Sequence, residues 1–219
     1  ILSGLVGSEM CIRDSGDTAL VVDAIVSQSL SSIWKLGAGV SVPTGSIDEE
    51  GDTPRAPGNQ QLPYTMQLGS GTWHIRLLLS FRKYGAQWDW GVNADFTWRT
   101  GKNDRDYRLG NKAGVGGWFQ WKGFTAFSPG MRLHYRWRGT IAGQDAALLV
   151  PNPQFPYPAP VTNPSAFGGE QIDLTGFLRS PFANGWYTEA SYAQPLYLDL
   201  NGPQSSEKYH FSIEIGTSF

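Results

Sequence analysis

Charged side chains at alternating positions are the residues of this 219-residue sequence that could do chemistry. Two alternating segments flank a short break at residues 84–87. If they form a hairpin centred on that break, Arg82 would lie opposite Asp89 and Arg76 opposite Asp95 on the same face of a sheet. Charges in a narrow, poorly hydrated interior need partners of this kind. The spacing therefore predicts a ladder of ion pairs along one sheet face.

Other polar residues at alternating positions would extend the same lining. They are Asn93, Arg99, Arg132, His134, Arg136, Arg138, Asp173, Arg179, Glu189 and Glu214. One interpretation is a selectivity lining for anionic or polar aromatic solutes. The simpler alternative is a polar network that only satisfies a filled interior. The sequence leaves both open.

Catalysis and metal binding have weaker support. His74, His134 and His210 could act as bases, since outer-membrane phospholipase and palmitoyl-transferase barrels use serine and histidine chemistry. None of the three lies in a recognisable nucleophile motif. The acidic run DEEGD at residues 48–52 lacks the spaced ligands of a calcium loop. We therefore expect no enzyme, no cofactor and no metal site, with an in-barrel lipid-modifying enzyme as the least favoured alternative.

Strands with two unlike faces must position these residues. From 88 to 99, apolar and polar residues alternate strictly, as they do from 209 to the terminal Phe219. A soluble sheet would turn the apolar face inward, whereas a barrel in lipid turns it outward. Trp and Tyr near the ends of the apolar faces match the aromatic girdles of membrane interfaces. We therefore expect an antiparallel transmembrane β-barrel, with Phe219 as its membrane-targeting terminus.

Nine strands are predicted, each with about the ten residues that a tilted strand needs to cross the hydrocarbon. Their ranges are 17–27, 33–43, 71–83, 88–100, 111–122, 125–138, 169–179, 185–195 and 206–219. Short and long connections alternate, as periplasmic turns and extracellular loops do. With the carboxyl terminus in the periplasm, the first strand runs downward. An earlier upward strand is then expected, in a barrel of about ten to twelve strands.

Residues 1–15, ILSGLVGSEMCIRDS, resemble a translated sequencing adaptor and are excluded from the predicted fold, which spans residues 16–219. The alternative, a genuine first strand, lacks clean alternation. Cys11, the single cysteine, lies in this segment. The rest of the chain would contain none, as in many proteins that cross the periplasm.

Composition limits the function classes. The net charge of -2 gives no basic footprint for nucleic acid, and no apolar run approaches the length of about 18 residues expected of a spanning helix. The expected partners are outer-membrane lipids and lipopolysaccharide, the barrel-assembly machinery and a small hydrophobic or aromatic solute.

Four segments carry a more specific resemblance: VPTGSIDEEG (42–51), LPYTMQLGSGTW (62–73), NDRDYRLGN (103–111) and PLYLDLNGPQ (195–204). They resemble motifs of the outer-membrane family named for the meta-pathway of phenol degradation. The resemblance implies a barrel in the outer membrane of a Gram-negative bacterium and transport linked to aromatic catabolism. His74 departs from the motif, because an acidic residue is expected after the tryptophan.

The sequence thus predicts a passive channel for small aromatic or hydrophobic compounds. Loop 43–70 is expected to fold inward or cap the mouth, because Leu62, Pro63, Tyr64 and Met66 are too apolar for a loop facing water. A structural barrel with a filled lumen is the alternative.

Overall fold

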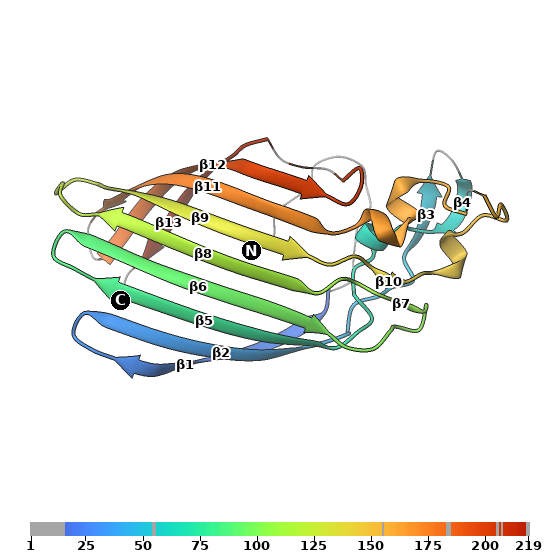
Figure 1. Ribbon diagram of the computed structural model, residues 1–219, viewed down its shortest axis with the longest axis horizontal. Coiled ribbons are helices and arrows are strands. Elements are labelled where there is room, and N and C mark those ends of the chain that lie inside the picture. The colour runs from blue at the N-terminus through green and yellow to red at the C-terminus, as the bar shows by residue number, and fades with distance from the viewer. Residues whose placement is uncertain are drawn as a thin grey trace.

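Nine long antiparallel strands form one curved sheet in a computed structural model of the chain (Figure 1). The structure describes residues 16–53, 56–154, 156–182, 185–204, 206 and 208–217. In sheet order the strands are β1 (Thr18–Gln28), β2 (Ser32–Val42), β5 (His74–Tyr84), β6 (Trp88–Arg99), β8 (Lys112–Trp121), β9 (Ser128–Arg138), β11 (Gly169–Pro181), β12 (Trp186–Leu200) and β13 (His210–Thr217). The prediction of an all-β antiparallel fold is confirmed.

The remaining elements are short and lie in the long loops at one end of the sheet (Figure 1). They are β3 (Glu50–Thr53), β4 (Ala56–Gln61), β7 (Tyr107–Arg108), β10 (Ala142–Gly143) and four 3₁₀ helices: η1 (Tyr64–Met66), η2 (Ala146–Leu148), η3 (Pro160–Thr162) and η4 (Pro164–Ala166). The short turns gather at the other end. No helix in the described ranges is long and apolar enough to span a membrane.

Strands β1 and β13 are the two edges of the sheet. Within the described residues each pairs on one side only, β1 with β2 and β13 with β12. The expected ten to twelve strands would need further strands between these edges, so that count stays a prediction. Residues 1–15 and Phe219 lie outside the described residues.

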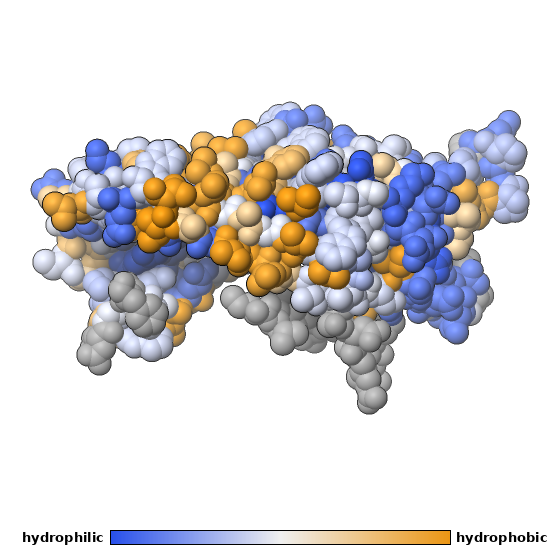
Figure 2. Space-filling model, turned by 90° about the horizontal axis from the view of Figure 1, so that it is seen from below, coloured by the Kyte–Doolittle hydropathy of each residue, from blue (hydrophilic) through white to orange (hydrophobic). Residues whose placement is uncertain are grey.

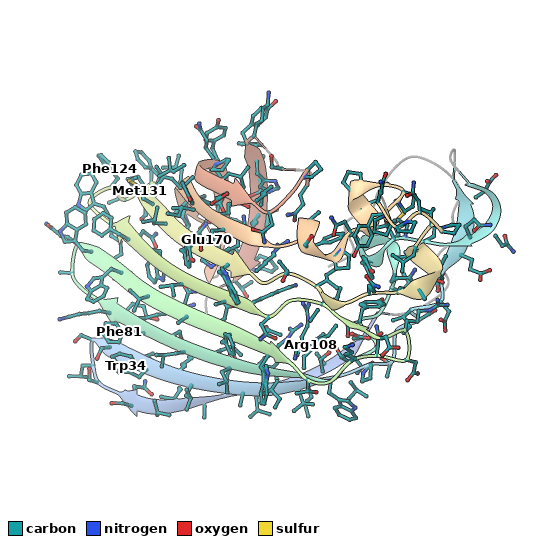
Figure 3. The ribbon with its side chains drawn as sticks, turned by 45° about the vertical axis from the view of Figure 1, so that its right-hand side comes forward. Trp34, Phe81, Arg108, Phe124, Met131 and Glu170 are labelled. Atoms are coloured by element: carbon teal, nitrogen blue, oxygen red, sulfur yellow. The ribbon has the colours of Figure 1, made fainter. Side chains whose placement is uncertain are left out.

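The apolar side chains of the alternating strands point away from the concave side and are exposed. Val92, Leu133 and Ile213 are 44%, 50% and 65% exposed. The rings of Trp34 on β2 and Phe81 on β5 pack side by side with centroids 4.5 Å apart (Figure 3). Apolar groups gather over the sheet, whereas the loop end is mostly hydrophilic on the face in Figure 2. Such exposure is costly in water and favourable in lipid.

The register of the hairpin β5–β6 differs from the predicted one by two residues. Arg82 lies opposite Gly91 and Arg76 opposite Thr97, so the two predicted ion pairs are wrong. The backbone N–H of Gly85 donates to the carbonyl of Trp88, which centres the turn one residue later than the sequence suggested. A two-residue shift keeps every side chain on its predicted face and changes only its neighbours.

Strand β12 is longer than predicted. It was expected to end at Pro195, which cannot donate a backbone hydrogen bond. A register shift between Ile172 and Asp173 of β11 accommodates the proline, and pairing then continues to Leu200. Bulges are a usual way for a strand to tolerate proline.

Most of the fully buried apolar side chains of the described residues lie in the long loops. Tyr64, Tyr107, Ile141 and Leu148 form one cluster, with Leu109 and Phe167 packed against it. We call these six residues the cap cluster. The molecule therefore has a small apolar core at its loop end and a polar interior along the sheet.

Candidate functional site

The sheet brings the predicted lining residues to one face. The strand registers place all thirteen predicted lining positions on the concave side, alternating with the exposed apolar residues: Arg76, Arg82, Asp89, Asn93, Asp95, Arg99, Arg132, His134, Arg136, Arg138, Asp173, Glu189 and Glu214. Their neighbours differ from those predicted. Some of the observed ion pairs connect strands that are joined by a long loop. Others connect strands that are joined by a short turn.

Near the short turns, Glu189 holds two arginines. Its carboxylate pairs with Arg132 of β9, and it accepts hydrogen bonds from Nε and Nη2 of Arg179 at 2.9 and 2.7 Å. The two guanidinium groups lie 4.1 and 4.3 Å from the ring centroids of Phe177 and Tyr187. We call these five residues the turn-end cluster. Glu189 is only 2% exposed, so its charge depends on these two partners.

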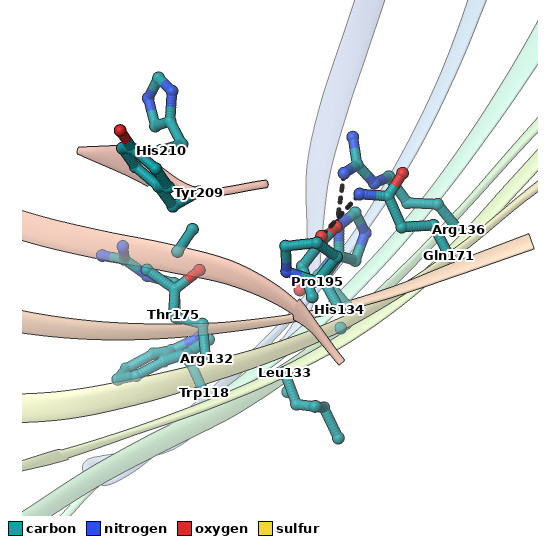
Figure 4. A pocket seen from close by; sticks show the side chains of 15 residues that line it. Trp118, Arg132, Leu133, His134, Arg136, Gln171, Thr175, Pro195, Tyr209 and His210 are labelled. Atoms are coloured by element: carbon teal, nitrogen blue, oxygen red, sulfur yellow. Dashed lines mark hydrogen bonds and ion pairs between the residues drawn. The ribbon is translucent and has the colours of Figure 1, made fainter. Parts of the chain in front are cut away.

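Halfway along the sheet, Asp173 accepts hydrogen bonds from Arg136 and from Gln171 Nε2, the latter at 2.7 Å (Figure 4). These residues line a cavity of about 520 Å³ with His134 and His210. The buried His134 Nε2 and Arg136 Nε have no hydrogen-bond partner among the described residues. Leu133, in the same strand, points away from the cavity (Figure 4). The inner wall thus carries unused hydrogen-bonding groups beside an open volume.

Glycine on the inner face makes room for large neighbours. A Cβ at Gly91 would lie 2.6 Å from Nε1 of Trp118, closer than side chains approach one another. Gly130 lies in the same way against the Phe177 ring. The rings therefore lie flat on the wall, which keeps the lumen wider than aromatic side chains standing upright would allow.

Asp89 is paired with a lysine that is not among the predicted lining residues. Lys122 Nζ lies 2.8 Å from Asp89 and also donates to the carbonyl of Gly85 at 2.8 Å. Lys122 is the last residue of the predicted strand 111–122 and lies directly after the end of β8; it was not assigned to Asp89 because the predicted register paired Asp89 with Arg82. Arg82 makes no salt bridge to a carboxylate in the described part of the chain.

The apolar loop segment is divided between the interior and the surface. Leu62 and Tyr64 are buried, Pro63 is half-buried, and Met66 is exposed. The Tyr64 ring meets Tyr107 edge-on at 4.7 Å and Phe167 at 5.8 Å, and its hydroxyl accepts the N–H of Asp145 at 3.1 Å. Met66 therefore does not belong to the cap as predicted, because the η1 turn that buries Tyr64 directs Met66 outward.

Further contacts tie three long loops together. Arg105 Nε lies 2.6 Å from Asp48, and its Nη1 lies 3.2 Å from the buried Asp145.

Burial raises the pKa of Tyr64 and raises that of Tyr107 to about 12. Both hydroxyls therefore stay neutral at physiological pH and act as packed, hydrogen-bonding groups.

A second cavity, of about 660 Å³, lies between the cap cluster and the loop ends of the strands. We call it the vestibule. Cationic side chains of β6, β8 and β9 line its wall, and apolar cap residues line its roof. Lys112, a part of this wall, was not among the predicted lining residues, although it lies in the predicted strand 111–122.

The histidines are not brought together around a nucleophile. His74 Nε2 lies 3.3 Å from Thr72 Oγ1, while the nearby carboxylate of Asp17 accepts the Ser70 hydroxyl directly. In a catalytic triad the histidine would stand between hydroxyl and carboxylate. Across the described ranges, no group of three or more His, Cys, Asp or Glu side chains is placed to hold a metal ion.

No family model matches the sequence, and no curated protein matches it. Among solved structures, the fold is similar to that of an outer-membrane channel from Pseudomonas putida F1, with a TM-score of 0.59 and 14% sequence identity. The match covers 91% of this chain and 64% of the channel, so this chain spans slightly less than two thirds of the channel's length. The sheet of this protein is therefore similar in fold to the matched part of that channel.

Proposed function

We propose that the protein is a passive outer-membrane channel for small aromatic or hydrophobic compounds in a Gram-negative bacterium. The proposal rests on the two faces of the sheet. Exposed apolar side chains lie on the outer face, and charged side chains and two cavities lie on the inner face. Lipid and lipopolysaccharide would contact the outer face. The barrel-assembly machinery would be a further partner.

The sizes of the cavities support a small solute. Volumes of about 520 and 660 Å³ fall within the range of roughly 300 to 1,000 Å³ that small-molecule sites occupy. The aromatic cap supports an apolar solute body. The loop motifs, which resemble those of the phenol-degradation family, favour a ring compound.

A structural barrel with a filled lumen is the second candidate, and the turn-end cluster favours it. Two arginines, one glutamate and two rings fill that part of the interior with mutually satisfied groups. In the channel, this cluster would have to leave a passage beside it.

Solute entry into proteoliposomes separates these candidates. The full-length protein is reconstituted, and entry of phenol is compared with entry into empty vesicles. Tyr64→Ala, which removes the central ring of the cap cluster, should increase entry because it opens the mouth. Met66→Ala is the matched control, since that side chain is 57% exposed and should leave the rate unchanged. Entry at the empty-vesicle rate for the wild type and for Tyr64→Ala would leave the filled barrel as the better account.

A further inference from the structure

The vestibule wall concentrates positive charge at one level of the sheet. Arg99 of β6, Lys112 of β8 and Arg138 of β9 all line it from neighbouring strands. Lys112 and Arg138 lie directly opposite each other in the β8–β9 register. Like charges in this position destabilise a sheet, so the arrangement has a cost in the empty state.

Two carboxylates act on this group electrostatically without pairing with it, Asp17 on Arg99 and Asp95 on Lys112. None of these three cations forms a salt bridge to a carboxylate of the described residues, and Arg76 on β5 adds a fourth positive charge to the same field. Asp17 is the acidic residue lining the vestibule. Its oxygens already accept the N–H of Gly45 at 3.2 Å and the N–H of Ser70 at 3.0 Å.

Arg99 supplies a second and independent indication of a ligand. It is only 7% exposed, yet its Nε has no hydrogen-bond partner within the part of the chain that the structure describes. Its Nη1 donates to the carbonyl of Gly110, which fixes the guanidinium at the wall. A buried donor left without an acceptor costs free energy; because Nε is buried, an anion in the vestibule would satisfy it only with a shift of the Arg99 side chain and otherwise acts on the guanidinium through its charge.

The roof of the vestibule has the opposite chemistry. Tyr64, Leu109, Ile141 and Phe167 line it, and all four belong to the cap cluster. The edge-to-face packing of Tyr64 against Phe167 holds the rings in place. A ligand bound between wall and roof would meet cations on one side and a rigid apolar surface on the other.

We propose that the vestibule is a binding site for an aromatic carboxylate, with the carboxylate at Arg99, Lys112 and Arg138 and the ring against the cap cluster. The proposal rests on the channel function and narrows its solute class from aromatic compounds to aromatic anions. Charge-assisted hydrogen bonds hold the carboxylate, and burial of the ring adds the apolar contribution. Neither part alone fills the site.

Equilibrium binding to the full-length protein in detergent micelles tests this without requiring conduction. The probes are benzoate, phenol, acetate and inorganic phosphate. Benzoate should bind saturably. Phenol, acetate and phosphate should each bind at least about tenfold more weakly, because each lacks one of the two recognised parts.

Two wall variants and one matched control locate the site. Lys112→Gln and Arg138→Gln should each weaken benzoate binding about tenfold and change phenol binding by less than twofold. Lys102→Gln removes one positive charge from the same end of the molecule, outside the vestibule, and should leave benzoate binding unchanged. Electrophoretic heat modifiability verifies that each variant has folded.

Equal binding of benzoate and phenol by the wild type would overturn the proposal, even if neither wall variant folds. So would competition by phosphate or acetate at the strength of benzoate, because the site would then recognise charge alone. Unchanged benzoate affinity in both wall variants would place the anion elsewhere. Phenol entry into proteoliposomes is measured separately. The proposed channel function is therefore tested by that measurement, whatever the result for benzoate binding.

Discussion

Replacing Glu189 by glutamine should destabilise the sheet, whereas the same replacement of its cross-strand neighbour Glu214 should not. Glu189 on β12 is buried and pairs with both Arg132 and Arg179. Glu214 on β13 lies directly opposite, is exposed, and forms no salt bridge with a described residue. The two changes are chemically identical, so their difference isolates the two ion pairs.

The expected magnitude follows from burial. Removing one partner of a fully buried ion pair costs about 3 to 5 kcal/mol, because a charge is left without compensation. The side chains of Arg132 and Arg179 are 37% and 34% exposed, so water can partly solvate them once the carboxylate is gone. We therefore expect Glu189→Gln to lower the free energy of unfolding by about 2 to 3 kcal/mol.

Glu214→Gln should have the opposite sign. It removes a like charge facing Glu189, and such pairs destabilise a sheet by roughly 0.2 to 1 kcal/mol. Guanidinium unfolding in detergent, followed by tryptophan fluorescence, measures both variants. Equal unfolding midpoints for Glu189→Gln and the wild type, or equal losses in the two variants, would refute the assignment of Glu189 as the centre of the turn-end cluster.

Three further outcomes are expected. Val92→Arg should block barrel assembly, because a cation at lipid mid-depth costs roughly 2 to 4 kcal/mol. Asn93→Arg, one residue away on the inner face, should assemble. Equal amounts of heat-modifiable protein from the two variants would place both faces in the same solvent. With the native cysteine replaced, Asp104→Cys should react with an impermeant thiol reagent on intact cells. Ala86→Cys should react only after lysis. The reverse pattern would invert the predicted orientation of the barrel in the membrane. Burial raises the pKa of Tyr107 from 10.0 to about 12, so stability from its neutral form should be complete below pH 10 and lost as the pH rises towards 12; tyrosinate absorbance that shows all tyrosines ionising together near pH 10 would contradict this.

The alternating pattern predicted the strands and their faces because each strand carries its own signal. Lipid on one side and a polar lumen on the other force period-two alternation within every strand, independent of its neighbours. Predicted and observed ends differ by four residues or fewer at all but one of the boundaries within the described residues. The exception is β12, which was predicted to end at Pro195 and continues past a bulge to Leu200.

Partners across strands could not be predicted in the same way. Arg82 and Asp89 were assigned to each other because a turn was centred one residue too early. Arg136 and Asp173 lie on strands joined by a loop of 30 residues, from 139 to 168, whose length fixes no register. Lys122, the last residue of the predicted strand 111–122, was not assigned to Asp89 because the predicted register gave that aspartate to Arg82. Local pattern therefore determines which face a charge occupies, and turn geometry and long-range pairing determine which charge it meets.

The distribution of paired and unpaired charge along the lumen has a consequence for the proposed channel. Cations at the vestibule are unpaired among the described residues, whereas Arg132, Arg136 and Arg179 further in are paired with Asp173 or Glu189, although Arg82 near the short turns is not. An anion would be attracted at the mouth by a field that weakens along β9 and β11 towards the short turns. Conduction requires that a solute bind strongly enough to enter and weakly enough to leave. Acidic partners deep in the lumen would meet the second requirement, because an arginine already engaged by a carboxylate has little attraction left for a passing anion.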